Sequence, residues 1–158
     1  MSELHLAYLN LGSNIQPESN LPRALELLSA FGEIVQISQV WESEPVGTTG
    51  ANYLNACVKF KTSMARSDMK EKIVRPIEDQ LGRQRGEDKF APRSMDIDII
   101  LFDDESINDD VWELAFVVVP LADIYPEYQV AKKKETILEI ATRLRREVWL
   151  EARPKVLT

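Results

Sequence analysis

The order of strand-like and helix-like segments is the feature that most constrains the fold of this chain. Four segments have the alternating or Ile-, Leu- and Val-rich patterns that are typical of strands. Between them, two segments place apolar residues every three or four positions, as in a helix with one buried face. The expected strands are residues 4–11, 33–41, 53–62 and 94–102, and the expected helices are residues 19–32 and 67–81.

The resulting order, strand, helix, strand, strand, helix, strand, matches the split βαβ arrangement of ferredoxin-like folds. It predicts an α+β sandwich in which an antiparallel or mixed sheet carries helices on one face. Farther along, residues 111–120 indicate another strand and residues 136–146 a last helix. Pro76 falls inside the second helical pattern and predicts a kink or a split there. A length of 158 residues favours one domain over residues 1–158.

Charge and composition exclude several classes of protein. The chain has 26 acidic and 19 basic residues and a net charge of −7, which argues against a nucleic-acid partner. Cys57 is the only cysteine, so neither an intrachain disulfide nor a cysteine-based zinc site is expected. No apolar run approaches the length of a membrane span, and the first residues do not resemble a signal peptide. We therefore expect a cytoplasmic protein without a membrane partner, and the oligomeric state stays open.

Two carboxylates stand on one face of the expected strand 94–102. Asp96 and Asp98 are two residues apart, so their side chains point the same way, roughly 6–7 Å apart. Asp disfavours strands, and paired carboxylates in an apolar segment need a neutralising partner. Mg²⁺ suits such a pair, because it takes one or two carboxylates together with substrate phosphates. The alternative is an edge strand on which both Asp side chains meet water.

Four cations lie within eleven positions just before this pair: Arg83, Arg85, Lys89 and Arg93. Guanidinium groups bind phosphate in a bidentate manner and remain charged. Beside a metal-binding pair they form the clamp expected for phosphoryl transfer. The alternative is a solvated charged loop.

A third group of residues suits a flat heterocycle. Asn55 has a donor and an acceptor for the edge of a ring, and Tyr53 and Phe116 can stack on its faces. The alternative is that both aromatic residues belong to the core. The sequence has neither a P-loop nor a dinucleotide-binding glycine motif, and its only histidine, His5, has no partner motif for nucleophilic catalysis.

Together these residues resemble the 6-hydroxymethyl-7,8-dihydropterin pyrophosphokinase family of folate biosynthesis, in register over residues 6–128. The family fold is a ferredoxin-like sandwich, and the Pro-Arg-x-x-Asp-x-Asp-Ile element is specific in this context. The matching pieces are Leu11-Gly12-Ser13-Asn14, Pro45-Val46-Gly47, Tyr53-Leu54-Asn55-Ala56, Ile77-Glu78, Gly82-Arg83-x-Arg85, Ala91-Pro92-Arg93-x-x-Asp96-x-Asp98-Ile99-x-Leu101-Phe102, Pro120-Leu121 and Ile124-x-Pro126-Glu127.

The resemblance implies a reaction and a role for each matching position. The pterin hydroxymethyl oxygen attacks the β-phosphorus of ATP, AMP leaves, and the pyrophosphate stays on the pterin. Asp96 and Asp98 are the implied ligands of two Mg²⁺ ions, and Arg83 and Arg93 act with them as catalytic residues on the phosphates. The implied pterin-binding residues are Ser43, Val46, Tyr53, Asn55 and Phe116, and the implied nucleotide-binding residues are Glu78, Arg85, Phe90, Arg93 and Ile99.

The chain departs from the family pattern between the Asp-x-Asp strand and Phe116. Relatives have a longer segment there, with a Pro-His-Tyr-like element and an Arg that contact the nucleotide, whereas this chain has only residues 109–115. Either other cations hold ATP, with Lys132–Lys134 as candidates, or ATP binds weakly, or the phosphate donor differs. A pterin- or nucleotide-binding relative without turnover, and a transferase for another heterocyclic alcohol, therefore stay open beside the pyrophosphokinase.

Overall fold

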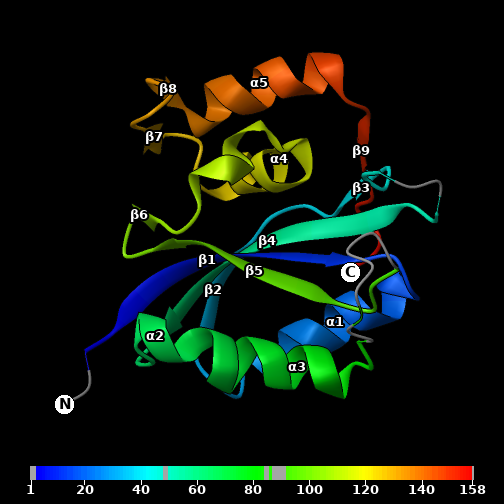
Figure 1. The fold of residues 1–158 in the computed structure, drawn as a ribbon, viewed down its shortest axis with the longest axis vertical. Helices are drawn as coiled ribbons and strands as arrows, with labels where there is room; N and C mark the ends of the chain where they lie inside the picture. The colour runs from blue at the N-terminus through cyan, green and yellow to red at the C-terminus, as the bar shows by residue number, and fades with distance from the viewer. Residues whose placement is uncertain (1–2, 48–49, 84–85, 87–91, 158) are drawn as a thin grey trace.

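The structure, a computed structural model, describes residues 3–47, 50–83, 86 and 92–157. An antiparallel sheet forms its centre, with helices on both faces (Figure 1). Its strands are β1 (His5–Ser13), β2 (Glu33–Ile37), β3 (Trp41–Ser43), β4 (Tyr53–Thr62), β5 (Asp96–Phe102), β6 (Glu105–Ser106) and β9 (Leu150–Ala152), and β7 (Gln129–Val130) and β8 (Glu135–Thr136) form a separate ribbon. The helices are α1 (Pro17–Leu28), α2 (Arg66–Met69), α3 (Arg75–Gln80), α4 (Ala115–Ile124) and α5 (Ile137–Glu147).

The sheet has the strand order expected of a ferredoxin-like fold. The order is β6-β5-β1-β4-β3-β9, and β2 also pairs with β4. Every pair in the sheet is antiparallel. The predicted α+β class is therefore confirmed. The single strand predicted over residues 33–41 is instead two strands, β2 and β3, which pair with successive parts of β4.

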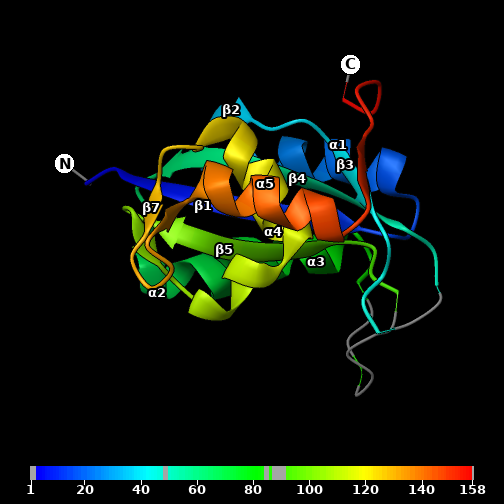
Figure 2. The same cartoon turned by 90° about the horizontal axis from the view of Figure 1, so that it is seen from above.

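Each face of the sheet has its own hydrophobic core. On one face, α1 and α3 pack against side chains of β1 and β4 such as Leu9 and Phe60. On the opposite face, α4 and α5 cover Tyr8, Trp41 and Cys57 (Figures 1 and 2). The sequence led us to expect helices on one face, and the structure corrects this to both faces. No helix in the described part of the chain is long and apolar enough to cross a membrane.

Of the two helices on this face, the predicted last helix over residues 136–146 is confirmed as α5, whereas the prediction of a strand was wrong for α4. Residues 111–120, the expected strand, form a 3-10 helix (Asp109–Glu113) and the first part of α4. Helix α4 lies between the sheet and α5, so it is apolar on nearly every side (Figure 1). A short, continuous apolar run of this kind does not distinguish a buried strand from a buried helix by periodicity.

The predicted interruption of the second helix is present. A π-helical turn (Lys70–Val74) separates α2 from α3, and Pro76 lies in the first turn of α3. Gly82, with φ of 86°, follows the end of this helical segment. The interruption matters for the site, since Lys70 is the first residue of the π-helical turn, Arg75 directly follows the turn, and both line the same cavity.

The pairing of β1 with its two neighbours sets the positions of the polar side chains. Gly12 of β1 pairs with Asn55 of β4 on one side and with Asp96 of β5 on the other. Two residues earlier, Asn10 pairs in the same way with Cys57 and Asp98. Directly opposed residues share a face of the sheet, so these two rows of side chains lie next to each other beneath α4.

Candidate active site

Two adjoining cavities lie where the polar ends of β1, β4 and β5 meet. The larger has a volume of about 770 Å³ and runs along β5, between α3 and the segment that leads into α4. The smaller has a volume of about 190 Å³ and lies over β1, β3 and β4. Arg93 and Asp96 line both cavities, so a molecule in one contacts the same ionic group as a molecule in the other.

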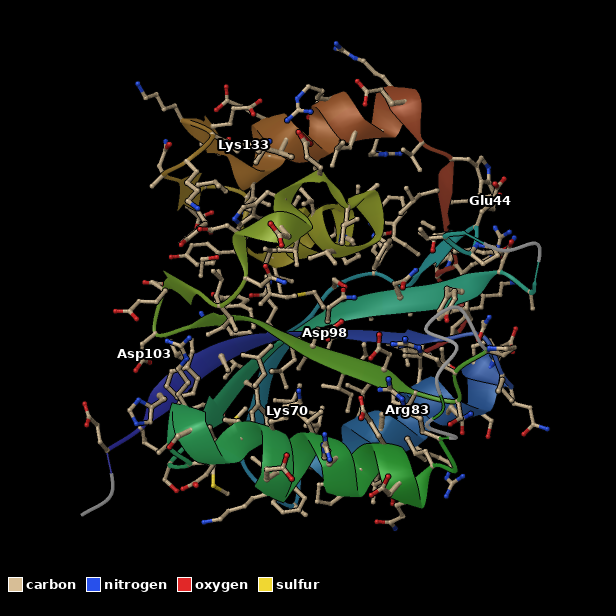
Figure 3. The ribbon with its side chains drawn as sticks, in the orientation of Figure 1. Glu44, Lys70, Arg83, Asp98, Asp103 and Lys133 are labelled. Atoms are coloured by element: carbon tan, nitrogen blue, oxygen red, sulfur yellow. The ribbon has the colours of Figure 1, made fainter. Side chains whose placement is uncertain are left out.

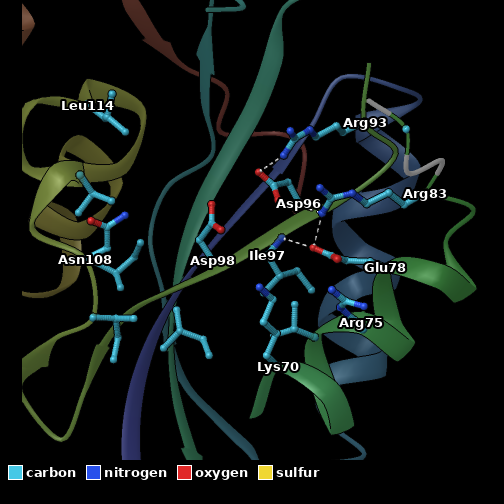
Figure 4. Close-up of a pocket in the computed structure, with 16 residues that line it drawn as sticks. Lys70, Arg75, Glu78, Arg83, Arg93, Asp96, Ile97, Asp98, Asn108 and Leu114 are labelled. Atoms are coloured by element: carbon cyan, nitrogen blue, oxygen red, sulfur yellow. Dashed lines mark hydrogen bonds and ion pairs between the residues drawn. The ribbon is translucent and has the colours of Figure 1, made fainter. Parts of the chain in front are cut away.

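Asp96 is held between two guanidinium groups at this junction (Figure 4). Arg83 Nη1 donates to Asp96 Oδ1 at 3.0 Å, and Arg93 Nη1 lies 3.1 Å from Asp96 Oδ2. All three side chains are partly buried, so water screens these contacts less than it screens a surface ion pair. The arrangement fixes the two arginines with their charge toward the cavity before any anion binds.

Glu78 supports the arginine clamp from α3. Its side chain is buried, and Oε2 accepts from Arg83 Nη1 at 2.7 Å and from the backbone N–H of Ile97 at 2.9 Å. One carboxylate oxygen therefore ties helix α3 to the start of β5 and orients Arg83 (Figure 4). Glu78 also lines the larger cavity. The sequence predicts that Glu78 lies near the nucleotide.

The Asp98 carboxylate differs from that of Asp96 in having no hydrogen bond or ion pair with any described residue. The cavity leaves its side chain open to water, while protein surrounds the carboxylate on its other sides. Burial, followed by the charges of Asp96 and Glu78, raises the pKa of Asp98 to about 6. The ionised group thus stands in a negative local field that a bound cation would relieve.

The smaller cavity is organised by neutral hydrogen bonds. Asn55 Nδ2 donates to Ser43 Oγ at 2.8 Å and to the Trp41 carbonyl at 3.2 Å, which fixes the amide of this buried residue. Gly12 lies beneath it, and a Cβ there would approach Asn55 Oδ1 to 3.1 Å. Burial raises the pKa of Tyr53, so its phenol is neutral at physiological pH. The pocket is suited to a flat, uncharged ring.

Asn14 connects the loops around both cavities. Its Oδ1 accepts from the Arg93 N–H at 2.7 Å, its own N–H donates to the Arg93 carbonyl at 3.0 Å, and its Nδ2 donates to the Ala51 carbonyl at 3.2 Å. The backbone that carries Arg93 is thereby fixed to the end of β1. The sequence singled out Asn14 only as part of a motif and gave it no role in the site.

The structure brings the described candidate residues together around the two cavities. The smaller cavity contains all five residues predicted to bind the pterin, and the larger contains all four predicted catalytic residues. The nucleotide candidates Glu78, Arg93 and Ile99 also line the larger cavity. Arg85 and Phe90 lie outside the described residues. The five pterin candidates are Ser43, Val46, Tyr53, Asn55 and Phe116.

Lys70 and Arg75 are cavity residues that sequence reasoning missed. Both line the larger cavity near Glu78 (Figure 4). The cations proposed from sequence are placed elsewhere: Lys132 pairs with Asp109 and Lys133 with Glu113, and neither lines the cavity. Figure 3 shows Lys133 in the α5 layer, well away from Asp98 and Lys70. No local pattern in the sequence marks Lys70 and Arg75 as cavity residues, because only the fold shows which face of this helical segment the cavity covers.

Comparisons with known proteins converge on one family. A family model described as 7,8-dihydro-6-hydroxymethylpterin-pyrophosphokinase (HPPK) matches residues 8–126, which include every residue of the site described above. A Bacillus subtilis protein named 2-amino-4-hydroxy-6-hydroxymethyldihydropteridine pyrophosphokinase is 37% identical over 132 residues, which are 76% of this chain and 78% of that protein. A Methylorubrum extorquens protein of the same name is 35% identical over 150 residues, 87% of this chain and 92% of that protein.

Solved structures show the same fold at low identity. The chain is similar to wild-type Plasmodium falciparum HPPK-DHPS crystallised with SDX-DHP, with a TM-score of 0.71 and 13% identity. With the pteroate complex of the same wild-type protein, the TM-score is 0.70 at 14% identity. Both alignments cover 90% of this chain, but the chain spans only 45% and 43% of the respective Plasmodium chains.

Proposed function

Since the chain belongs to the 7,8-dihydro-6-hydroxymethylpterin-pyrophosphokinase family, we propose that it transfers pyrophosphate from ATP to 6-hydroxymethyl-7,8-dihydropterin. The observation that carries the proposal is the ionic group Arg83–Asp96–Arg93 at the junction of the two cavities. A pterin in the smaller cavity and a triphosphate in the larger would meet at this group. The need for ATP also supports the cytoplasmic location that the sequence predicts.

The pterin half of the proposal rests on shape and hydrogen bonding. Asn55, fixed by Ser43 and by the Trp41 carbonyl, presents its remaining acceptor to the ring edge. Tyr53 and Phe116 line the same pocket and supply faces for stacking. A neutral bicyclic ring requires no charged partner, which fits the hydrogen bonding of this pocket.

The nucleotide half rests on charge. Lys70, Arg75, Arg83 and Arg93 surround the larger cavity, whose volume of about 770 Å³ is within the range of ligand pockets. The opposite wall, formed by Ile107, Asn108, Val111 and Leu114, has no cation. This is the segment in which the family's His, Tyr and Arg have no counterpart. Lys70 and Arg75 therefore take over part of the phosphate binding from the side of α3.

Asp96 and Asp98 are the residues that would hold magnesium. They are suited to it because Asp98 is unpartnered within the described chain and its pKa is raised by burial and by neighbouring carboxylates. Among the described residues there is no cluster of three or more metal-binding side chains. Two carboxylates completed by phosphate oxygens and water match the preference of Mg²⁺. When bound, magnesium would neutralise phosphate charge and lower the pKa of the pterin hydroxyl.

The reaction is a displacement at phosphorus. The pterin hydroxyl oxygen bonds to the β-phosphorus, and the bond from that phosphorus to the α–β bridging oxygen breaks. AMP leaves with the bridging oxygen, and the hydroxyl proton passes to water. Arg83 and Arg93 hold the phosphates in position and stabilise the charge that develops on them.

The test is release of AMP from ATP and Mg²⁺, with and without 6-hydroxymethyl-7,8-dihydropterin. The expected result is AMP release that depends on the pterin and is lost in the Asp96→Ala/Asp98→Ala double variant. Circular dichroism of that variant establishes that it is folded. Absence of AMP at millimolar ATP, from protein that binds the pterin, would instead identify a binding relative or a different phosphate donor. Turnover assays with a panel of other heterocyclic alcohols would identify a transferase that uses a different acceptor.

A further inference from the structure

Asn10 is a polar residue whose side chain is buried in the middle of the sheet. Its relative exposure is 3%, and its Oδ1 is fully buried without a partner. None of the described residues hydrogen-bonds its amide. A buried polar atom in this state costs about 1–3 kcal/mol of stability, so its retention calls for an explanation.

The neighbours of Asn10 within the protein do not satisfy it. Across β4 its partner is Cys57, a fully buried thiol and at best a weak donor, whose pKa burial raises. Across β5 its partner is Asp98, and no hydrogen bond joins the two side chains. Along β1, Tyr8 stacks on Tyr125 at a centroid distance of 4.9 Å. Asn10 lines the smaller cavity, so a molecule bound there lies beside its amide.

The position of β1 in the sheet explains how a bound ligand can contact Asn10. A ligand that reaches from Asn55 on β4 to Asp96 on β5 must cross β1, which lies between those two strands. Strand β1 contributes two residues to the cavity lining, Gly12 and Asn10. Gly12 has no side chain, so Asn10 provides the polar side chain of β1 beneath the ligand. It lies one row closer to Asp98 than Asn55 does.

We propose that the Asn10 amide hydrogen-bonds a nitrogen on the ring edge of the bound pterin that carries the hydroxymethyl group. This inference rests on the proposed function, because it takes the pterin as the occupant of the smaller cavity. An amide has both a donor and an acceptor and satisfies either kind of ring nitrogen by turning about its last bond. The hydrogen bond would orient the ring with its hydroxymethyl group toward Asp96 and Asp98. Asn10 thereby adds a determinant of ring orientation to Asn55.

Asn10→Ala tests the proposal, with Ser94→Ala as the matched control. Ser94 Oγ is also buried without a partner, but Ser94 lines neither cavity. Affinity for 6-hydroxymethylpterin is measured by calorimetry with Mg²⁺ and a nucleotide whose α–β bridge is methylene, which blocks turnover. We expect Asn10→Ala to weaken pterin binding about tenfold, the effect of one lost hydrogen bond. Ser94→Ala should bind pterin as the wild type does.

Thermal unfolding of the ligand-free proteins provides a second readout. Removing an unsatisfied amide should leave the Tm of Asn10→Ala equal to or above that of the wild type. A marked fall in Tm would mean that the free protein already satisfies the amide, and would overturn the proposal. The isosteric Asn10→Asp places a carboxylate beside Asp96 and Asp98, and it should also weaken pterin binding.

The outcomes separate this inference from the proposed function. Wild-type affinity in both Asn10 variants, with a wild type that binds the pterin, overturns the role of Asn10 and leaves the proposed function intact. A wild type that binds nucleotide but no pterin overturns both together.

Discussion

The two cavities are built in opposite ways. The smaller one lies over β1, β3 and β4, and neutral hydrogen bonds fix the amide of Asn55 within it. The larger one is held by ions: Arg83 bridges Glu78 and Asp96, and Asp98 stands without a partner in the described chain. A site for a neutral ring can thus be preorganised by the sheet itself. A site for a polyanion instead has charged side chains of both signs before the anion and its cation bind.

Asp98 provides the sharpest way to separate the two cavities, because it lines only the larger one. We expect Asp98→Asn to lower kcat by about 10³-fold, since a group that stabilises charge in the transition state is lost. Affinity for the pterin in the absence of nucleotide should remain that of the wild type. Turnover assays and calorimetry measure the two effects. Loss of pterin affinity in this variant would mean that the cavities are not independent.

Asn55 is the corresponding residue of the smaller cavity. We expect Asn55→Ala to raise KM for the pterin roughly 20-fold, because the ring loses a contact and the Ser43 hydroxyl loses its partner. KM for ATP should change by less than about twofold. Ser94→Ala, outside both cavities, serves as the control. An equal rise in both KM values would contradict a separate pterin pocket.

The same contrast explains which parts could be predicted from the sequence. Strand alternation and short motifs predicted β1, β4 and β5, and with them the positions of Asn55, Asp96 and Asp98. Helix α4 was not predicted, because a helix buried on nearly every side has no polar face to reveal its period. Lys70, Arg75 and Asn10 were missed for another reason. Their place in the site depends on which elements meet in space, and no local pattern encodes that.

Lys70 and Arg75 test whether charge from α3 and the turn before it replaces the shortened segment. We expect the Lys70→Ala/Arg75→Ala double variant to raise KM for ATP about fivefold, and the effect to shrink at high salt, because both side chains are exposed. Pterin affinity should be unchanged. Lys72→Ala is the matched control, since Lys72 lies on the same helical segment, pairs with Asp68 and does not line the cavity. If the KM for ATP of the double variant equals that of the wild type, Arg83 and Arg93 bind the phosphates without help from Lys70 and Arg75.

The last prediction concerns stability, and it measures the free-energy cost of keeping Asp98 ionised in the larger cavity. Because the pKa of Asp98 rises from 3.8 to about 6 on folding, the native state binds the proton more tightly than the unfolded state does. Without metal, the wild type should therefore lose stability relative to Asp98→Asn as pH rises from about 4 to 6, with a constant difference above that range. Thermal unfolding in chelator across pH 4–8 measures this. Adding Mg²⁺ and a nucleotide should reverse the order, since only the wild type keeps both carboxylates to bind the cation. If Asp98→Asn is less stable than the wild type at pH 7 in chelator, the carboxylate has a partner in the free protein, and the contrast between hydrogen-bonded Asn55 and unpartnered Asp98 fails.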